Sequence, residues 1–140
     1  MIIYCAGPIK GDTKFQGNYK DIVRIVESME HTALAEFSSK IPSTMLLNDK
    51  QIYTRDKKWI DGSKIMIAEV SGPSLGVGFE ISYALFVKKI PVLAVYDEKA
   101  ESVSSMILGC SEPNLQVKKY YNKEDLERTI RNFIANNGGN

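Results

Sequence analysis

The chain has 140 residues, enough for one domain with one core, and its 44% hydrophobic and 25% charged residues are ordinary for a globular protein. Its formal net charge of +1 lacks the basic excess typical of proteins that bind nucleic-acid polymers. No apolar run approaches the roughly 18 residues of a membrane-spanning helix, and residues 1–5 form too short a run for a signal peptide. We therefore expect a cytoplasmic protein, or a nuclear one if the source is eukaryotic, with Cys5 and Cys110 reduced.

Short apolar runs alternate along the chain with amphipathic or strongly apolar stretches. The runs are typical of buried parallel strands, and they cover residues 2–6, 32–37, 64–70, 91–96 and 115–120. The intervening stretches predict helices, which start at a capping Asn18, cover 51–60, 80–87 and 103–108, and resume after a capping Asn122.

This alternation predicts a single α/β domain, with a five-stranded parallel sheet and helices on both faces. Right-handed crossovers leave few topologies, and we favour the flavodoxin-like strand order 2-1-3-4-5. The domain is expected to cover residues 1–135, with a disordered tail at 136–140.

Two glycine-rich loops follow the first and third strands, at residues 7–12 and 71–78. In the favoured topology both flank the point where the strand order switches, which is where ligands bind. Glycines let backbone N–H groups approach a ligand, and a helix N-terminus favours an anion. Ser74 adds a hydroxyl group and Lys10 a positive charge. The pattern is compatible with a phosphate site and, equally, with tight strand-to-helix turns.

Gly76 and Gly78 also match the first two glycines of the dinucleotide-binding fingerprint, and Asp97 ends the next strand. However, Ile81 occupies the third glycine position, and the motif follows the third strand instead of the first. A dinucleotide site is therefore the weaker interpretation.

Glu80 opens an apolar helix just after the second loop. An acidic residue there commonly complements the helix dipole. Glycosidic chemistry, in contrast, needs a second carboxylate, for which Glu36, Asp56 and Glu69 are candidates that spacing alone does not rank. The pattern leaves both interpretations of Glu80 open.

The stretch 56–84 contains Pro-Ser-Leu-Gly-Val-Gly-Phe-Glu and resembles the 2′-deoxynucleoside 5′-phosphate N-hydrolases of the nucleoside 2-deoxyribosyltransferase superfamily. Residues 4–11 and 104–109 resemble two further blocks of that family, in the same order. The resemblance implies an N-glycosidase that releases the base from 2′-deoxynucleoside 5′-monophosphates and leaves 2-deoxyribose 5-phosphate. It also implies a flavodoxin-like homodimer that uses no metal or cofactor.

The resemblance carries over to individual positions. Glu80 matches the nucleophile that forms a covalent glycosyl-enzyme, Asp56 the acid near the base, and Tyr4 a tyrosine linked with preference for 2′-deoxy sugars. The positions expected to contact substrate or its phosphate are Gly7, Ile9, Lys10, Gly11, Ser74 and Gly76, with Ser104 and Met106 completing the site of the neighbouring subunit.

The chain also departs from this family. Pro8 replaces a frequent serine, Lys10 keeps the charge of an arginine but loses its bidentate fork, and Phe37 replaces a frequent histidine. The segment 38–50 is shorter than in the animal enzymes. These changes leave base preference open. The alternatives are a deoxyribosyltransferase that exchanges bases and a non-catalytic nucleotide-binding module, although Ser74 favours a phosphorylated substrate.

Overall fold

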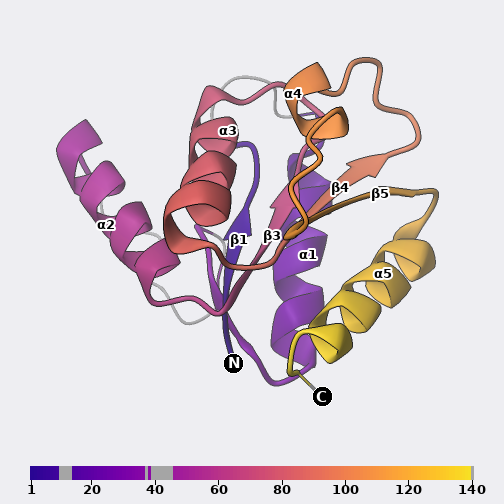
Figure 1. Ribbon diagram of the computed structural model, residues 1–140, viewed down its shortest axis with the longest axis horizontal. Coiled ribbons are helices and arrows are strands. Elements are labelled where there is room, and N and C mark those ends of the chain that lie inside the picture. Colours follow the sequence, from indigo (N-terminus) through magenta and orange to yellow (C-terminus); the bar gives the residue numbers. More distant parts are fainter. Residues whose placement is uncertain (10–13, 37, 39–45, 140) are drawn as a thin grey trace.

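The strands of the computed structural model form one parallel sheet of order β2-β1-β3-β4-β5 (Figure 1), which confirms the predicted topology. The structure describes residues 1–9, 14–36, 38 and 46–139. Its elements are β1 (Ile2–Ala6), α1 (Gln16–Ser28), β2 (Thr32–Leu34), α2 (Asp49–Asp61), β3 (Ile65–Glu69), α3 (Leu75–Ser82), the π-helix η1 (Tyr83–Lys88), β4 (Val92–Asp97), α4 (Ser105–Leu108), β5 (Leu115–Tyr120) and α5 (Lys123–Asn136). No helix in these ranges is long and apolar enough to cross a membrane.

The sheet separates two apolar layers. Side chains alternate along each strand, so Ile3 and Cys5 of β1 pack with α1 and α5, whereas Tyr4 and Ala6 pack on the other face with α3, η1 and the end of α2. Figure 1 shows α1 and α5 side by side, apart from α2 and α3. Tyr4 is thus the β1 residue that faces the helix beginning after β3.

The third helix begins earlier than predicted. Ser74 is its N-cap, and its Oγ accepts a hydrogen bond of 3.3 Å from the Val77 N–H. Residues 75–79, expected to lie largely in a loop, therefore form the start of α3, and Glu80 lies in its second turn. The helix dipole acts mainly in the first turn, so it does not account for an acidic residue at this position.

Other boundaries also differ from the predicted ones. Phe15, not Asn18, is the N-cap of α1, and the Asn18 amide donates instead to Asp97 Oδ2 at 3.1 Å. A capping box between Asn48 and Gln51 starts α2 before the predicted residue 51. The edge strand β2 ends at Leu34, because its pairing with β1 extends no further.

The C-terminal boundary needs a similar correction. Asn122 caps α5 as predicted, but the helix runs to Asn136, inside the segment expected to be a disordered tail. The N–H groups of Asn137 and Gly139 then both donate to the Ile134 carbonyl, so residues 137–139 are hydrogen-bonded to the helix end.

A buried carboxylate ties the loop after β3 to the neighbouring strands. Glu69 is 1% exposed and accepts hydrogen bonds from the Tyr120 hydroxyl and, at 2.6 Å, from the Ser71 N–H. Ser71 Oγ in turn accepts from the Asp97 N–H at 2.7 Å. Burial raises the pKa of Glu69. Its partner Tyr120 belongs to the layer of α1 and α5, so Glu69 serves the architecture on that face.

Candidate active site

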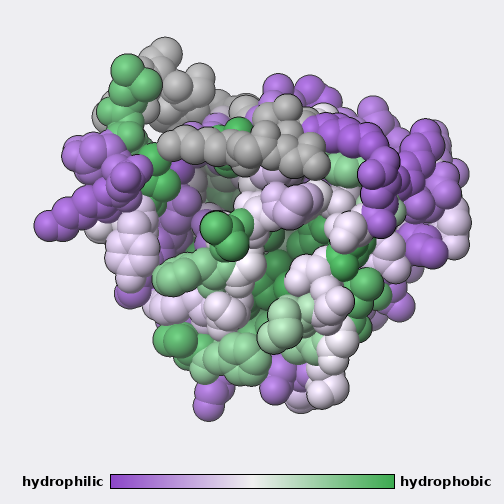
Figure 2. Space-filling view, turned by 90° about the horizontal axis from the view of Figure 1, so that it is seen from above, coloured by the Kyte–Doolittle hydropathy of each residue, from purple (hydrophilic) through white to green (hydrophobic). Residues whose placement is uncertain are grey.

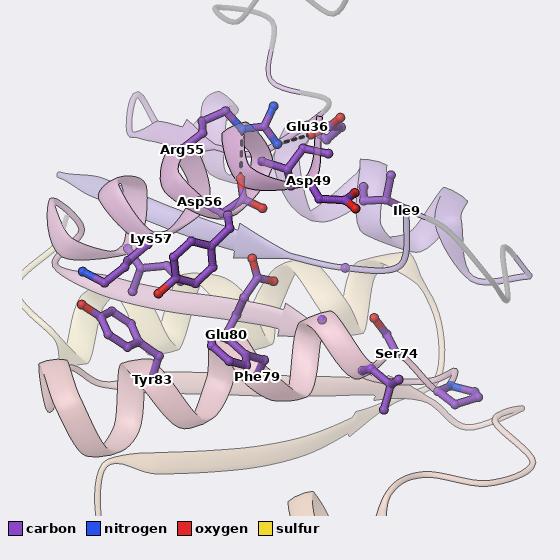
Figure 3. A pocket seen from close by; sticks show the side chains of 17 residues that line it. Ile9, Glu36, Asp49, Arg55, Asp56, Lys57, Ser74, Phe79, Glu80 and Tyr83 are labelled. Atoms are coloured by element: carbon purple, nitrogen blue, oxygen red, sulfur yellow. Dashed lines mark hydrogen bonds and ion pairs between the residues drawn. The ribbon is translucent and has the colours of Figure 1, made fainter. Parts of the chain in front are cut away.

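A pocket of about 850 Å³ opens between α2 and α3, beside the loops that follow β1 and β3. This is the predicted switch point in strand order. The view from above shows hydrophobic surface gathered near the centre of this end of the molecule, with hydrophilic surface around much of it (Figure 2). Asp56 and Glu80 point toward one another across the pocket from α2 and α3, while Ser74 lies toward the start of α3 (Figure 3).

Tyr4 and Glu80 are directly joined. The buried Tyr4 hydroxyl, which rises from β1, donates a short hydrogen bond to Glu80 Oε2. Burial and the nearby Glu80 and Asp56 carboxylates raise the pKa of the Tyr4 phenol far above its ordinary value. The phenol therefore keeps its proton and acts as a fixed donor to Glu80.

The pKa of the Glu80 carboxyl group lies well above its ordinary value. Burial raises its pKa to about 7, the Tyr4 hydrogen bond opposes that shift, and Asp56 adds to it. Burial also raises the pKa of Asp56. Two interacting carboxyls of this kind titrate as a pair, so near neutral pH the pair retains one proton for a substantial part of the time.

Asp56 is held from its other side by Arg55. The Arg55 Nε donates to Asp56 Oδ1 at 2.9 Å, and its Nη2 donates to Glu36 Oε2 at 2.6 Å (Figure 3). The Arg55 guanidinium carbon lies 4.4 Å from the centroid of the Trp59 ring. Arg55 was not among the residues expected from the sequence, although its spacing of four residues from Trp59 on a predicted helix is a recognisable cation–π signal.

The geometry ranks the three candidate partners of Glu80. Asp56 interacts with Glu80 directly, whereas Glu36 lines the same pocket and is joined to Asp56 through Arg55. Glu69 is turned to the opposite face of the sheet, where Tyr120 and Ser71 occupy its oxygens. A smaller cavity of about 40 Å³ reaches Tyr4, Asp56 and Glu80, and that volume is large enough for a water molecule.

Four of the positions expected around a phosphate line the pocket: Gly7, Ile9, Ser74 and Gly76. The two glycines differ in their surroundings. A Cβ at Gly7 would lie 2.3 Å from Cγ of Tyr19, so packing alone requires glycine there, whereas a Cβ at Gly76 would meet no atom within 4 Å. Lys10 and Gly11 lie outside the described residues, as does Phe37.

Ser104 and Met106 do not line this pocket. Ser104 is the N-cap of α4, where its Oγ accepts from the Met106 N–H at 3.2 Å, and Met106 is 81% exposed. Within the described part of the chain, no cluster of three or more histidine, cysteine, aspartate or glutamate side chains is arranged to hold a metal ion.

Residues 3–128 match the family model described as nucleoside 2-deoxyribosyltransferase. A protein of Syntrophotalea carbinolica named "Putative 2'-deoxynucleoside 5'-phosphate N-hydrolase 1" is 34% identical, over 96% of this chain and 95% of its own length. A 5-hydroxymethyl-dUMP N-hydrolase of Esox lucius is 29% identical, over 96% of each protein.

A solved structure shares the fold at lower sequence identity. The Clostridium botulinum CMP N-glycosidase superimposes with a TM-score of 0.68 at 17% identity, covering 94% of this chain and 98% of its own.

The surroundings of Glu80 disfavour its ionised form, so we predict that the ionised carboxylate lowers the free energy of unfolding of the protein. Its pKa lies above the ordinary 4.5 of an unfolded chain, so folding retains a proton that the unfolded state releases, and stability falls as the pH rises from about 4.5 to 7. We expect Glu80→Gln to raise the free energy of unfolding at pH 8 by on the order of 2 kcal/mol. Denaturant unfolding at pH 8 and pH 5 measures this, and the gain should shrink at pH 5. The exposed Glu112→Gln is the control; equal stability of wild type and Glu80→Gln at pH 8 would contradict the prediction.

Proposed function

Because the chain belongs to the nucleoside 2-deoxyribosyltransferase family, we propose that it is an N-glycosidase that hydrolyses the base–sugar bond of 2′-deoxynucleoside 5′-monophosphates. The observation that carries this proposal is the partly buried Glu80 carboxylate, held by Tyr4 and adjacent to Asp56 at the switch-point pocket. The names of the relatives from Syntrophotalea carbinolica and Esox lucius support the same class of reaction. The products of the proposed hydrolysis are the free base and 2-deoxyribose 5-phosphate.

The first half of the proposed reaction forms a covalent glycosyl-enzyme. In the reactive arrangement the proton of the carboxyl pair lies on Asp56, and Glu80 is ionised. An oxygen of Glu80 forms a bond to C1′ while the bond from C1′ to the base nitrogen breaks. The bonding electrons leave with the base, which receives the proton of Asp56.

The second half regenerates the carboxyl pair. A water molecule attacks C1′, Asp56 accepts its proton, and the Glu80 oxygen departs with its bonding electrons. When the Glu80 oxygen departs, Glu80 becomes negatively charged again. The Tyr4 hydroxyl stabilises this charge, because its hydrogen bond favours the ionised form. The cavity of about 40 Å³ beside Tyr4, Asp56 and Glu80 offers room for such a water.

The mechanism predicts that Glu80→Gln releases base from deoxynucleoside monophosphates at least about a thousandfold more slowly than the wild type. A neutral amide of the same shape cannot form the glycosyl-enzyme, although the variant should remain folded. The wild-type kcat/KM should fall as the pH rises above about 7, because the carboxyl pair then loses the proton that the departing base needs. Chromatography of the released base measures both effects, with Glu112→Gln as the control. Wild-type turnover by Glu80→Gln would rule out the nucleophile, and transfer of deoxyribose to an added second base would favour the transferase.

A 5′-phosphate fits the start of α3. The Leu75 and Gly76 N–H groups lie in the first turn, where a helix supplies no acceptors of its own. Ser74 Oγ accepts from the Val77 N–H, which leaves the hydroxyl proton available to an anion. Both Ser74 and Gly76 line the pocket, and a helix N-terminus favours negative charge.

We therefore expect Gly76→Ala to raise KM for a deoxynucleoside monophosphate several-fold, because its methyl group would occupy the open space before the phosphate. Hydrolysis of the unphosphorylated nucleoside should change little. Gly78→Ala is the matched control, because Gly78 is also a helical glycine facing open space but does not line the pocket. Both variants should gain about 0.5–1 kcal/mol of stability from better helix propensity. Equal KM effects of the two variants on the phosphorylated substrate would argue against this phosphate site.

We also propose a cytoplasmic homodimer in which Ser104 and Met106 reach the pocket of the neighbouring subunit. Leu75 and Met106 are 97% and 81% exposed, and large exposed apolar side chains are typical of interaction surfaces. Ile107 packs in the same apolar layer as Ile81 of α3, which joins α4 to the helix that carries Glu80.

A mixing experiment tests the shared site. Glu80→Gln and Ser104→Ala should each be impaired, and remixing them should restore up to about a quarter of wild-type activity, because half of the dimers would be mixed and each would have one intact site. A mixture of Glu80→Gln and Asp56→Asn should restore none, because both residues belong to one chain's pocket. Sedimentation measures the dimer, and equal recovery in both mixtures would contradict the shared site.

A further inference from the structure

Arg55 has no part in the two chemical steps, yet it lies among the groups that carry them. Two cationic side chains are found among the described residues that line the pocket, Arg55 and Lys57. The Lys57 Nζ pairs with Asp61 at 3.4 Å, whereas Arg55 contacts both Glu36 and Asp56. Of the two cations among the described lining residues, Arg55 is therefore the one that acts directly on the carboxyl pair.

Three independent contacts fix the Arg55 guanidinium. Its Nη2 bonds to Glu36, which follows β2, its Nε bonds to Asp56 on α2, and its face covers the Trp59 ring one turn further along α2. A planar guanidinium has the geometry to satisfy two acceptors while its face stacks on an aromatic ring. A lysine would supply the charge without this fork.

Holding Asp56 in this way has a geometric consequence. The hydrogen bond from Arg55 Nε to Oδ1 of Asp56 limits rotation of that carboxyl group. The charged and titratable groups around the pair of Asp56 and Glu80 come from several elements: Tyr4 from β1, Glu36 after β2 and Arg55 from α2. Arg55 favours the ionised forms of both Asp56 and Glu80, whereas the charge of Glu36 favours protonated Asp56.

We propose that Arg55 is a positioning residue for the hydrolysis, and that its guanidinium, anchored by Glu36 and Trp59, fixes the Asp56 carboxyl against Glu80 for proton transfer to the departing base. The inference rests on the proposed function for its chemistry and on the contacts of Arg55 for its geometry. Arg55 acts through Asp56 and does not touch the reacting atoms.

Opposite shifts of the kcat/KM pH profile in two variants distinguish this role from a general disturbance of the pocket. In Arg55→Met, kcat should fall roughly 10- to 100-fold with little change in KM, and the alkaline limb of the kcat/KM profile should move to higher pH, because two carboxyls lose a nearby cation. In Glu36→Gln the limb should move to lower pH, because Asp56 loses a nearby negative charge. Arg55→Lys should keep the limb near its wild-type position while kcat falls. Arg24→Met, which breaks an arginine–aspartate pair on α1, is the control.

A readout that does not depend on turnover separates the two proposals. The Glu80 carboxyl, labelled with carbon-13, can be titrated by NMR in the wild type, Arg55→Met and Glu36→Gln. If the wild type releases no base, the proposed function fails, while the titration still tests Arg55. Equal titration midpoints in all three proteins, shifts of the same sign in the two variants, or a loss confined to KM would overturn the role of Arg55.

Discussion

The hydrogen bond from the Tyr4 hydroxyl to Glu80 joins β1, an interior strand of the sheet, to the helix that follows β3, and the rest of the site is arranged around it. It forms because strand alternation turns Tyr4 toward α3 and because α3 begins at Leu75, which carries Glu80 one full turn past the helix start. The bond also fixes which oxygen of Glu80 is engaged. Asp56, its Arg55 partner and the pocket between α2 and α3 then follow from where that carboxylate lies.

An ionised carboxylate in this position lowers the stability of the fold. Burial and Asp56 both favour its protonated form, and the single Tyr4 donor offsets this only in part. Glu69 provides a contrast within the same chain, because its two donors come from the loop after β3 and from β5, and its role is architectural. Functional sites commonly retain such locally unfavourable groups, whose cost is met by stability elsewhere in the domain.

The fold and part of the site could be predicted from the sequence. Particular residues show which features could not be predicted. Apolar runs and their alternation with helices predicted the strand order, because burial on both faces leaves a strong signal. The start of α3 was missed because a serine followed by glycines is typical of a loop, whereas the Ser74 cap makes it helical. Spacing could not rank Glu36, Asp56 and Glu69, since that depends on which face of the sheet each one occupies. The identification of Glu80 as a nucleophile came from family resemblance and stays a prediction.

The bond between Tyr4 and Glu80 also links residues that are 76 positions apart in the chain. Tyr4 belongs to the first strand, which is flanked by β2 and β3 and must pair with both. Non-local parallel pairing of this kind is slow to form, because the entropy of closing the intervening loop is lost before contacts repay it. During synthesis, β1 therefore cannot complete its pairing until β3 has emerged from the ribosome, and the candidate pocket cannot form before α3 follows.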